Sequence, residues 1–489
     1  MKKSRRTFLR DTACGLTAAA VVNSFEHLSI VNAMVNQQPE VASDYKALVC
    51  VFLTGGSDCN NMVVPYTGYS DANGYDATRT ASGLAVPKTA LVQISPPNQG
   101  GNIFGLHPNL SPEVANPAQA GGLLQPWTDG KLAILCNYGP LKQPTTKTQY
   151  QSNVGGAFRP YQLFSHSDQI NQQMSSIVNT TGQTGWGGRV ADNTGSLNGA
   201  TVLPMCMSVA GTNLFETGVT TRQIAIGTGT LQNVLSLSWS GPTAANPFNS
   251  GSSFRQLLGF DRGQTLIKGA SDTMNTALSA DQTLNQPDPP IATTFPTTGI
   301  GNQLKQVAKF VYLNTKGTLG MHRQIFFCSL GGFDTHTNET NTDPTQPNNA
   351  GNQGNLLTQF SQAVRAFYDE MNAQGISNSV TLFTLSDFGR TFQPSGSGAA
   401  SVGTDHAWGS HAFIMGGSVV GGTFYGTYPT LDVNGPDDDG GKRGRWIPTT
   451  AIDQYAATLA TWYGLPSNLL TTIFPNLSKF ATQTLTFLG

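Results

Sequence analysis

The sequence predicts an α/β fold built on a mainly parallel sheet. Four short apolar runs are continuous rather than alternating, which is typical of strands that are covered on both faces. Segments with helical periodicity lie between or after these runs, and strands that alternate with helices favour parallel pairing. The chain has 489 residues, enough for one large domain with insertions or for two domains.

The expected elements follow in chain order. The expected strands are residues 47–53, 132–135, 324–328 and 380–385, and the expected helices are residues 303–312, 356–371 and 451–463. Gly464 and Pro466 follow the last helix in the usual order of stop residues. Long connections fill residues 66–125, 140–300 and 390–450, and connections of this length carry function or form a cap. We expect a single domain over residues 34–489, with a cap-like or irregular insertion at about 140–300 and a Pro- and Thr-rich surface loop at 280–300.

The first 33 residues are typical of a twin-arginine signal peptide. Arg5 and Arg6 are followed by Thr7, Phe8 and Leu9, and a weakly apolar stretch covers residues 12–22. Residues 31–33 offer a small-residue cleavage site, so the mature chain is expected to begin near Met34. The expected partner is the twin-arginine export machinery, and the expected location is periplasmic or secreted. No later stretch has about 20 uninterrupted apolar residues, so no stable membrane span is expected.

Composition excludes several classes of protein. Charged residues make up 11% of the chain and the net charge is -1, so no basic patch indicates a nucleic-acid partner. Cys14 lies in the signal peptide, and the other five cysteines form no CxxC pair, which argues against a zinc ribbon and a disulfide scaffold. Four of them lie in apolar runs and are expected to be small buried hydrophobic residues. They are Cys50, Cys136, Cys206 and Cys328.

An aspartate lies shortly after each of three expected strands. The run 47–53 continues into TGGSDCNN, the run 324–328 into SLGGFDTHTNE, and the run 380–385 into SDFGRT. Ligands of open α/β sheets bind outside the carboxyl ends of the strands, where Asp58, Asp334 and Asp387 are expected to meet. The glycine pairs before Asp58 and Asp334 permit the sharp turns that this requires.

Histidines gather in the same clusters. His336 follows Asp334, and the motif GTDHAWGSH adds Asp405, His406 and His411. Carboxylate oxygen and imidazole nitrogen together suit zinc or manganese better than calcium or magnesium. The predicted ligands are Asp58, Asp334, His336, Asp387 and His406, with Asp405 and His411 as ligands or as supports of ligands.

Two further residues are candidates for a direct role in chemistry. Arg390 follows Asp387 closely enough to hold an anionic oxygen in a bidentate grip, although a salt bridge explains it equally well. Ser165 lies beside His166 and is a weaker candidate for a metal-activated nucleophile. His107 and His166 are the remaining candidates, without assigned roles.

The motifs GGSDCNN, SHSDQ, GWGGR, GGFDTHTNE, SDFGRT and GTDHAWGSHAFIMGG occur in this order over nearly all of the mature chain. This succession resembles the bacterial family called domain of unknown function 1501. Members of that family are commonly exported with twin-arginine signals and are grouped with the alkaline phosphatase and sulfatase superfamily. The resemblance implies an alkaline phosphatase-like, three-layer α/β/α sandwich with long loop insertions and a metal site at the carboxyl edge of the sheet.

The resemblance also implies roles for single residues. Asp58 resembles the first-strand metal ligand of the superfamily, and Asp334 with His336 resembles its acid and histidine pair. Asp387 lies where superfamily enzymes often show an Asp-His pair, but Phe388 occupies the place of that histidine. His406 or His411 resembles the late histidine ligand, and Cys59 stands where relatives often have glycine. A site for one metal ion, or a site kept for binding alone, is consistent with these departures.

Two hypotheses for function follow. The first is an exported, metal-dependent hydrolase or transferase that acts on a phosphate or sulfate ester or a similar anionic substrate, small or polysaccharide. The second is a non-catalytic exported protein that keeps the fold and serves binding or envelope assembly. Convergence of the predicted ligands on one point would favour the first.

Overall fold

The computed structural model describes residues 41–489 except residues 73, 202, 232–249, 261–262, 341–352 and 397–401. Contacts divide the chain into two units, Met1–Ser43 and Asp44–Gly489, and the fold below is that of the second unit. The expected signal peptide and its cleavage site lie outside the described residues. Within the described ranges, no helix combines the length and apolar character that crossing a membrane requires.

A central sheet of nine strands, counted over the described residues, organises the unit. In spatial order its strands are β11 (Phe424–Gly426), β5 (Leu132–Gly139), β10 (Ser410–Gly416), β9 (Val380–Ser386), β1 (Lys46–Thr54), β8 (Arg323–Gly331), β6 (Cys206–Ser208) and β7 (Ile224–Ala225), and β12 (Thr450–Ala451) pairs with β5. The four expected strands are confirmed as parts of β1, β5, β8 and β9. Residues 47–53 of β1 are buried, as the continuous apolar run predicts.

The direction of the strands decides which segments meet. β1 pairs in parallel with β8 and with β9, so the mainly parallel sheet is confirmed. β10 runs antiparallel to both β9 and β5. Because β10 is reversed, the residues before it, rather than those after it, reach the edge at which β1, β8 and β9 end.

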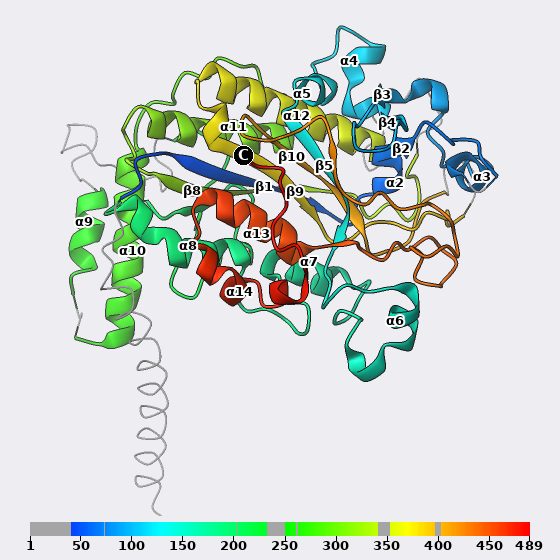
Figure 1. Ribbon diagram of the computed structural model, residues 1–489. Coiled ribbons are helices and arrows are strands. Elements are labelled where there is room, and N and C mark those ends of the chain that lie inside the picture. Colours follow the sequence, from blue (N-terminus) through cyan, green and yellow to red (C-terminus); the bar gives the residue numbers. More distant parts are fainter. Residues whose placement is uncertain are drawn as a thin grey trace, which may run out of the picture. The chain divides into compact units, whose positions relative to one another are not determined.

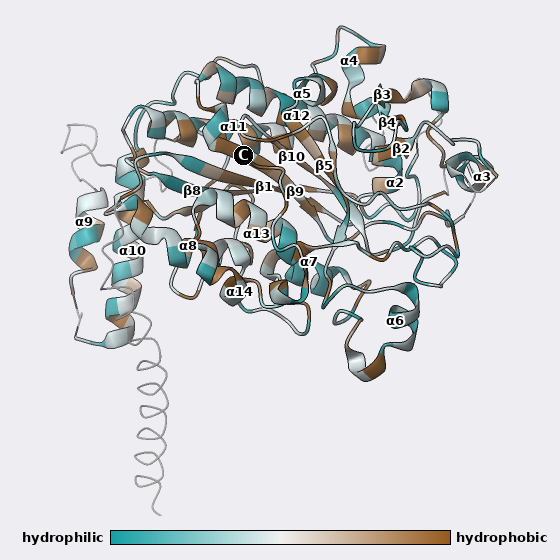
Figure 2. Cartoon of the chain, in the orientation of Figure 1, coloured by the Kyte–Doolittle hydropathy of each residue, from teal (hydrophilic) through white to brown (hydrophobic). Residues whose placement is uncertain are grey.

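Helices cover both faces of the sheet, which confirms the three-layer α/β/α arrangement (Figure 1). One face carries α11 (Gly299–Thr315) and α12 (Gln353–Ala373). The other carries α7 (His166–Ser175), α8 (Trp186–Thr194), α13 (Ile452–Tyr463) and α14 (Leu470–Ile473). Hydrophobic residues follow the central strands and polar residues gather on the outer helix surfaces (Figure 2). The three expected helices are confirmed within α11, α12 and α13.

The remaining elements lie in the long connections. They are α2 (Cys59–Met62), α3 (Tyr75–Arg79), α4 (Pro112–Ala115), α5 (Leu124–Thr128), α6 (Lys147–Ser152), α9 (Ser250–Leu257) and α10 (Thr265–Leu284), with a small antiparallel sheet of β2 (Val63–Pro65), β4 (Phe104–Leu106) and β3 (Val92–Ile94). Short 3-10 helices span Lys88–Ala90, Pro108–Leu110, Val154–Gly156, Gly195–Asn198, Ser377–Ser379, Ser467–Leu469 and Leu477–Lys479.

Residues 140–300 differ in part from the expected insertion. This segment supplies β6 and β7 to the central sheet and α7 and α8 to one of its faces, so part of it belongs to the layered core. The expected loop at 280–300 is also shorter than predicted, because α10 extends to Leu284 and α11 begins at Gly299. Leu278, Ala280 and Leu284 are buried, and their burial outweighs the weak helical signal of the local sequence.

All five cysteines of the described residues are free and buried. This confirms the expectation for Cys50, Cys136, Cys206 and Cys328 and extends it to Cys59. Burial raises the pKa of the Cys59 thiol to about 12, so this thiol is un-ionised at neutral pH.

Glu216 is a buried carboxyl group in the connection between β6 and β7. Asn213 donates a hydrogen bond to its Oε2 (2.8 Å), and Oε1 has no partner among the described residues. Burial raises the pKa of Glu216 to about 8. The folded protein therefore holds a proton that the unfolded chain releases near pH 4.5, so this group's contribution to stability is lost as the pH rises toward 8.

We expect the Glu216→Gln variant to lack this pH dependence. Between pH 5 and pH 8 the free energy of unfolding of the wild type should fall, relative to that of the variant, by roughly 3 kcal/mol. Urea denaturation at both pH values measures the difference. Asp192→Asn is a useful control. Burial acts to raise the pKa of Asp192, but side-chain and backbone hydrogen bonds hold it below its usual value, so this carboxyl group is ionised in both the folded and the unfolded chain from pH 5 to pH 8 and its replacement should leave the pH dependence unchanged. Parallel curves for wild type and Glu216→Gln would contradict the prediction.

Candidate metal centre

Segments that are distant in sequence meet at the carboxyl edge of the sheet. Asp334 and His336 follow β8, and Asp387 directly follows β9. His406 lies in the segment before the reversed strand β10, and His166 is the first residue of α7. The topology therefore explains why a motif before one strand joins motifs after two others.

Three histidine rings and one carboxylate converge there. The Nε2 atom of His406 lies 3.0 Å from Nε2 of His166 and 3.0 Å from Nε2 of His336. Oδ1 of Asp334 lies 3.1 Å from Nε2 of His336, 3.3 Å from that of His406 and 3.5 Å from that of His166. His166, Asp334 and His406 each offer a ligand atom within 4.8 Å of the others, close enough for the three to hold a metal ion. We call the four residues the histidine cluster.

The second ring nitrogen of each histidine faces an oxygen, which determines where the ring protons lie. Each Nδ1 donates its hydrogen to that oxygen, so the Nε2 atom of a neutral ring carries a lone pair. The acceptors are Asp387 Oδ2 for His166 (2.7 Å), the Phe164 carbonyl for His406 (2.9 Å) and Asp405 Oδ1 for His336 (3.2 Å).

Lone pairs that point at one another repel unless a positive charge lies between them. A single proton can be shared by only two of these atoms, whereas a divalent cation can accept lone pairs from several of them at once. Three imidazoles and a carboxylate also form a donor set that zinc and other transition metals accept. The residues present therefore fit a divalent metal ion, with the paired Nδ1 atoms orienting the rings as in known metal sites.

The local charges prepare the cluster for a cation. Burial by itself raises the pKa of Asp334, but the hydrogen bond and charge of Arg390, helped by His336 and His166, hold it below the usual value. The hydrogen bond that His166 donates to Asp387 raises the pKa of His166 against the effect of burial. Burial lowers the pKa of His406, so this ring is neutral and able to ligate.

Arg390 does not have the role that the sequence suggested. It is fully buried, and its Nη1 donates to Asp334 Oδ1 (2.9 Å) and to the Gly55 carbonyl (3.2 Å). Its Nη2 and Nε donate to the carbonyl and the hydroxyl of Thr404 (2.7 and 3.1 Å). With these donors committed inside the protein, Arg390 orients Asp334 and is not exposed to hold a substrate anion, so the salt-bridge alternative is the correct one.

Asp58 also differs from the prediction, because its carboxylate faces away from the histidine cluster toward another buried group. Its Oδ2 lies 2.5 Å from Nη1 of Arg79, and Asn60 donates to its Oδ1 (2.9 Å). Buried Glu339 adjoins it and has a raised pKa, first because of burial and then because of the charge of Asp58. Arg79 follows Asp58 by about twenty residues and lies in no motif that the sequence analysis identified. The ion pair could therefore not be predicted from the residues around Asp58.

Asp387 and Asp405 lie one contact away from the converging atoms. Asp387 is fully buried and receives hydrogen bonds from His166 and from the Gly55 amide (3.1 Å), so it orients a ligand rather than being one. Asp405 joins His336 to Arg443, whose Nη2 lies 2.6 Å from Oδ2. Both carboxylates therefore support a ligand. For Asp405 the sequence had left open whether it was a ligand or a support, whereas Asp387 had been expected to be a ligand.

His411, Ser165 and His107 do not join the cluster. His411 is buried in β10, accepts a hydrogen bond from the Asn137 amide (3.1 Å) and packs against the Tyr428 ring. Ser165 donates to Asp168 Oδ2 (2.6 Å) at the start of α7, an arrangement that does not activate it as a nucleophile. His107 accepts from the Asn109 amide (3.1 Å) in a short 3-10 turn.

Small and aromatic residues shape the floor of the cluster. Gly55 has a φ of 116°, and a Cβ there would lie 2.4 Å from the amide nitrogen of Asp334. A Cβ on Gly56 would lie 2.5 Å from the Phe388 ring. Phe388 itself packs against the rings of His406 (4.6 Å between centroids) and His166 (4.8 Å). The residue in the place of the expected histidine is therefore an apolar wall of the site.

His166 is the cluster residue that sequence reasoning left without a metal role. Its motif, SHSDQ, was noted for the serine beside it, and no strand precedes it to place it at the sheet edge. The usable signal was weak: a histidine at the start of a helix, next to acidic and hydroxyl residues. Only the packing of α7 against the sheet brings it beside His406.

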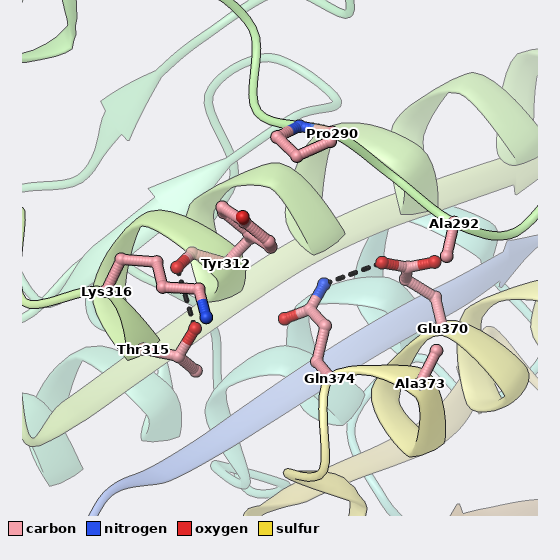
Figure 3. Close-up of a pocket in the computed structure, with 8 residues that line it drawn as sticks. All are labelled: Pro290, Ala292, Tyr312, Thr315, Lys316, Glu370, Ala373 and Gln374. Carbon is pink, nitrogen blue, oxygen red and sulfur yellow. Dashed lines mark hydrogen bonds between the residues drawn. The ribbon is translucent and has the colours of Figure 1, made fainter.

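Two cavities lie apart from the cluster residues. One, of about 150 Å³, opens between the ends of α11 and α12 and contains Glu370, which bonds Gln374 (3.0 Å) and the Thr293 amide (2.8 Å) (Figure 3). Because β8 and β9 begin after these helix ends, this cavity lies toward the amino ends of the strands. The other, of about 780 Å³, is lined by uncharged residues that include Asn109, Asn355 and Gln359. Neither includes a residue of the histidine cluster.

Comparison with known proteins finds one family model that matches part of the chain. Residues 274–438 match the model of the family described as "Protein of unknown function (DUF1501)". The match confirms the resemblance over the segment that holds Asp334, His336, Asp387 and His406. No curated protein matches the chain.

Three solved structures illustrate what the chain resembles. Ps i-CgsB in complex with k-i-k-neocarrahexaose shares 9% identity over 88% of this chain and 77% of its own, with a TM-score of 0.33. The PsFucS1 sulfatase from Pseudoalteromonas sp. shares 9% identity over 87% and 73%, with a TM-score of 0.28. The lipoteichoic acid synthase LtaP from Listeria monocytogenes shares 8% over 88% and 75%, with a TM-score of 0.29. Similarity at this level carries no information on activity.

Proposed function

We propose that this protein is an exported, metal-dependent hydrolase or transferase that acts on a phosphate or sulfate ester or a similar anionic group. The observation that carries the proposal is that Nε2 of His406 and Oδ1 of Asp334 lie 3.3 Å apart, and that each lies within 3.0 to 3.5 Å of the Nε2 atoms of both His166 and His336. We also propose that the N-terminal segment directs twin-arginine export, so that the site is assembled before the protein leaves the cytoplasm.

The metal would be held by His166, His406 and Asp334, with His336 beside them as a fourth donor. The mixed nitrogen and oxygen donors favour zinc or manganese over calcium or magnesium. When bound, such an ion polarises an ester oxygen and stabilises the negative charge that develops on it.

The protein's own residues would keep the site in one arrangement. Asp387 holds the His166 ring, and Arg390 holds Asp334 from the buried side. Phe388 covers one side of the His166 and His406 rings and limits the access of water there. In hydrolysis, a water oxygen forms a bond to phosphorus or sulfur while the bond to the ester oxygen breaks, and the leaving oxygen takes up a proton.

The first experiment is hydrolysis of an aryl phosphate and an aryl sulfate by purified full-length protein. We expect product release that rises on addition of zinc or manganese and that chelation removes. Asp334→Asn should lower the rate by about a hundredfold or more, because the amide removes the negative charge from the donor set. His322→Gln is the control: this histidine lies at the other end of β8, where its amide bonds Asn198.

The outcome separates the two hypotheses for function. Metal-dependent hydrolysis of either ester that fails in Asp334→Asn and persists in His322→Gln supports the enzyme. A protein that carries about one metal ion per chain but hydrolyses neither ester supports the binding protein instead. The observation that keeps this second hypothesis in view is that Ser165, the candidate nucleophile, donates its hydrogen bond to Asp168.

A further inference from the structure

We propose that Arg443 and Arg445 form an oxyanion-binding pair beside the histidine cluster and select substrates that carry a phosphate or sulfate group. This inference rests on the proposed function and gives its substrate a recognition site. The two arginines lie in residues 438–446, a loop whose ends meet in the bridge between Asp438 and Trp446. We call this the arginine loop.

The arginine loop is rigidly built. The Asp438 carboxylate accepts hydrogen bonds from the amides of Gly444 (3.1 Å) and Arg445 (3.2 Å) on Oδ1, and from those of Asn434 and Lys442 on Oδ2 (each 3.3 Å). The amides of Phe392 and Gln393 donate to the carbonyls of Gly444 (3.1 Å) and Arg443 (3.0 Å). These bonds commit the Asp438 carboxylate to the loop itself and fix the loop against the segment that follows β9.

Arg443 lies one contact from the cluster. Its Nη2 donates to Asp405 Oδ2 (2.6 Å), while Oδ1 of the same carboxylate receives the hydrogen of His336 Nδ1 (3.2 Å). Its Nε is buried without a partner among the described residues, whereas 34% of the side chain as a whole is exposed. Arg443 is therefore partly open to solvent next to a residue that orients one of the cluster rings.

Arg445 is connected to the histidine cluster through Phe164. Its guanidinium lies 4.5 Å from the centre of the Phe164 ring, and the Phe164 carbonyl accepts the hydrogen of His406 Nδ1 (2.9 Å). Its nearest carboxylate oxygen, on Asp439, is 3.8 Å from Nη1, beyond hydrogen-bonding distance. Its Nε is buried and also has no partner in the described ranges, while 29% of the side chain is exposed. Contact with the Phe164 ring holds the guanidinium in place without using its N–H donors.

Two guanidinium groups in this position match a tetrahedral anion. A guanidinium presents parallel N–H donors that pair with two oxygens of one phosphate or sulfate group. Arg390, by contrast, is fully buried, and its N–H groups donate to Asp334, Gly55 and Thr404. It therefore has no role in binding a substrate anion. The arginine loop thus carries the anion recognition that the sequence had suggested for Arg390.

The test measures binding of inorganic phosphate and inorganic sulfate to metal-loaded protein by calorimetry at constant ionic strength. We expect the dissociation constant of the wild type to rise about tenfold or more in Arg443→Gln and in Arg445→Gln, and further in the double variant. The dissociation constant of Arg445→Lys should lie between those of the wild type and Arg445→Gln, because lysine keeps the positive charge but lacks the paired N–H donors of the guanidinium group. Arg222→Gln is the matched control, since Arg222 donates only to backbone carbonyls of residues 218–221.

Metal content, measured on each variant, shows whether an effect comes from the anion or from the ion. Weaker phosphate binding at unchanged metal content supports the inference, even if no ester is hydrolysed and the proposed activity fails. Two results overturn it: neither anion binding the metal-loaded wild type at millimolar concentration, or the double variant binding both within twofold of the wild type. If aryl phosphate is hydrolysed equally by wild type and double variant, the proposed function stands and the arginine pair is wrong.

Discussion

A His406→Gln variant is expected not to bind a divalent ion at the proposed metal centre. Nε2 of His406 lies 3.0 Å from the Nε2 atoms of both His166 and His336, so it is the ring that the other two share. Glutamine keeps a polar side chain but offers no imidazole nitrogen. Elemental analysis of protein purified with added zinc or manganese should show about one ion per chain in the wild type and a background level in the variant.

A second substitution should weaken metal binding without abolishing it. Asp387→Asn keeps the shape of the side chain but weakens the hydrogen bond that orients the His166 ring, so metal affinity should fall by about 10- to 100-fold while the protein still binds the ion. Competition with a chromophoric chelator measures both affinities, and His322→Gln should match the wild type. Equal metal content in wild type and His406→Gln would show that the cluster holds no ion.

The Arg79→Met variant is expected to lower the free energy of unfolding by about 3–5 kcal/mol. Arg79 and Asp58 are both fully buried, and the arginine also donates to the carbonyls of Phe392 (2.9 Å) and Thr391 (3.0 Å). Its removal leaves Asp58 as an uncompensated buried charge next to Glu339. Urea denaturation at neutral pH measures the change.

Two comparisons make this result specific. Arg365→Met removes an arginine whose partner, Asp369, lies one helical turn away and is 41% exposed, and it should cost less than about 1 kcal/mol. Adding Asp58→Asn to Arg79→Met should recover part of the lost stability, because the uncompensated charge is gone. A loss below about 1 kcal/mol in Arg79→Met would contradict the prediction.

The effect on the metal centre should be measured in the same samples. Buried Glu339 lies beside Asp58, and Thr404 donates to Glu339 Oε2 (2.5 Å). Thr404 also accepts from Arg390, which holds Asp334. This chain of contacts runs from the buried ion pair to the histidine cluster, so a change at Arg79 is expected to weaken metal binding as well as folding.

Much of the fold could be predicted because its causes are local. The apolar runs around residues 47–53 and 380–385 identify strands that are buried on both faces, and Gly464 marks the end of α13 with a left-handed φ of 117°. The limits of the 140–300 segment could not be predicted. β6 has three residues, and its place in the central sheet is set by its pairing with β8 and β7.

The candidate site was predictable where a strand delivers the residue. Asp334 and His336 follow β8, and the sequence placed them at the carboxyl edge of the sheet. Asp58 and Asp387 follow strands too, yet their carboxylates turn to Arg79 and to the Nδ1 atom of His166. A position at the edge does not determine the direction of a side chain, because that depends on the charge and hydrogen-bond partners which the packed segments bring near.

Local sequence patterns are sufficient to predict a layered α/β domain, the burial of four of its cysteines, and acidic residues and histidines at one edge of the sheet. These follow from hydrophobic periodicity and from residues adjacent along the chain. The contacts of His166 with His406, of Arg390 with Asp334 and of Arg443 with Asp405 appear only in the folded structure. Those contacts join segments up to about 240 residues apart and depend on the reversal of β10 and the packing of α7, which no local pattern encodes.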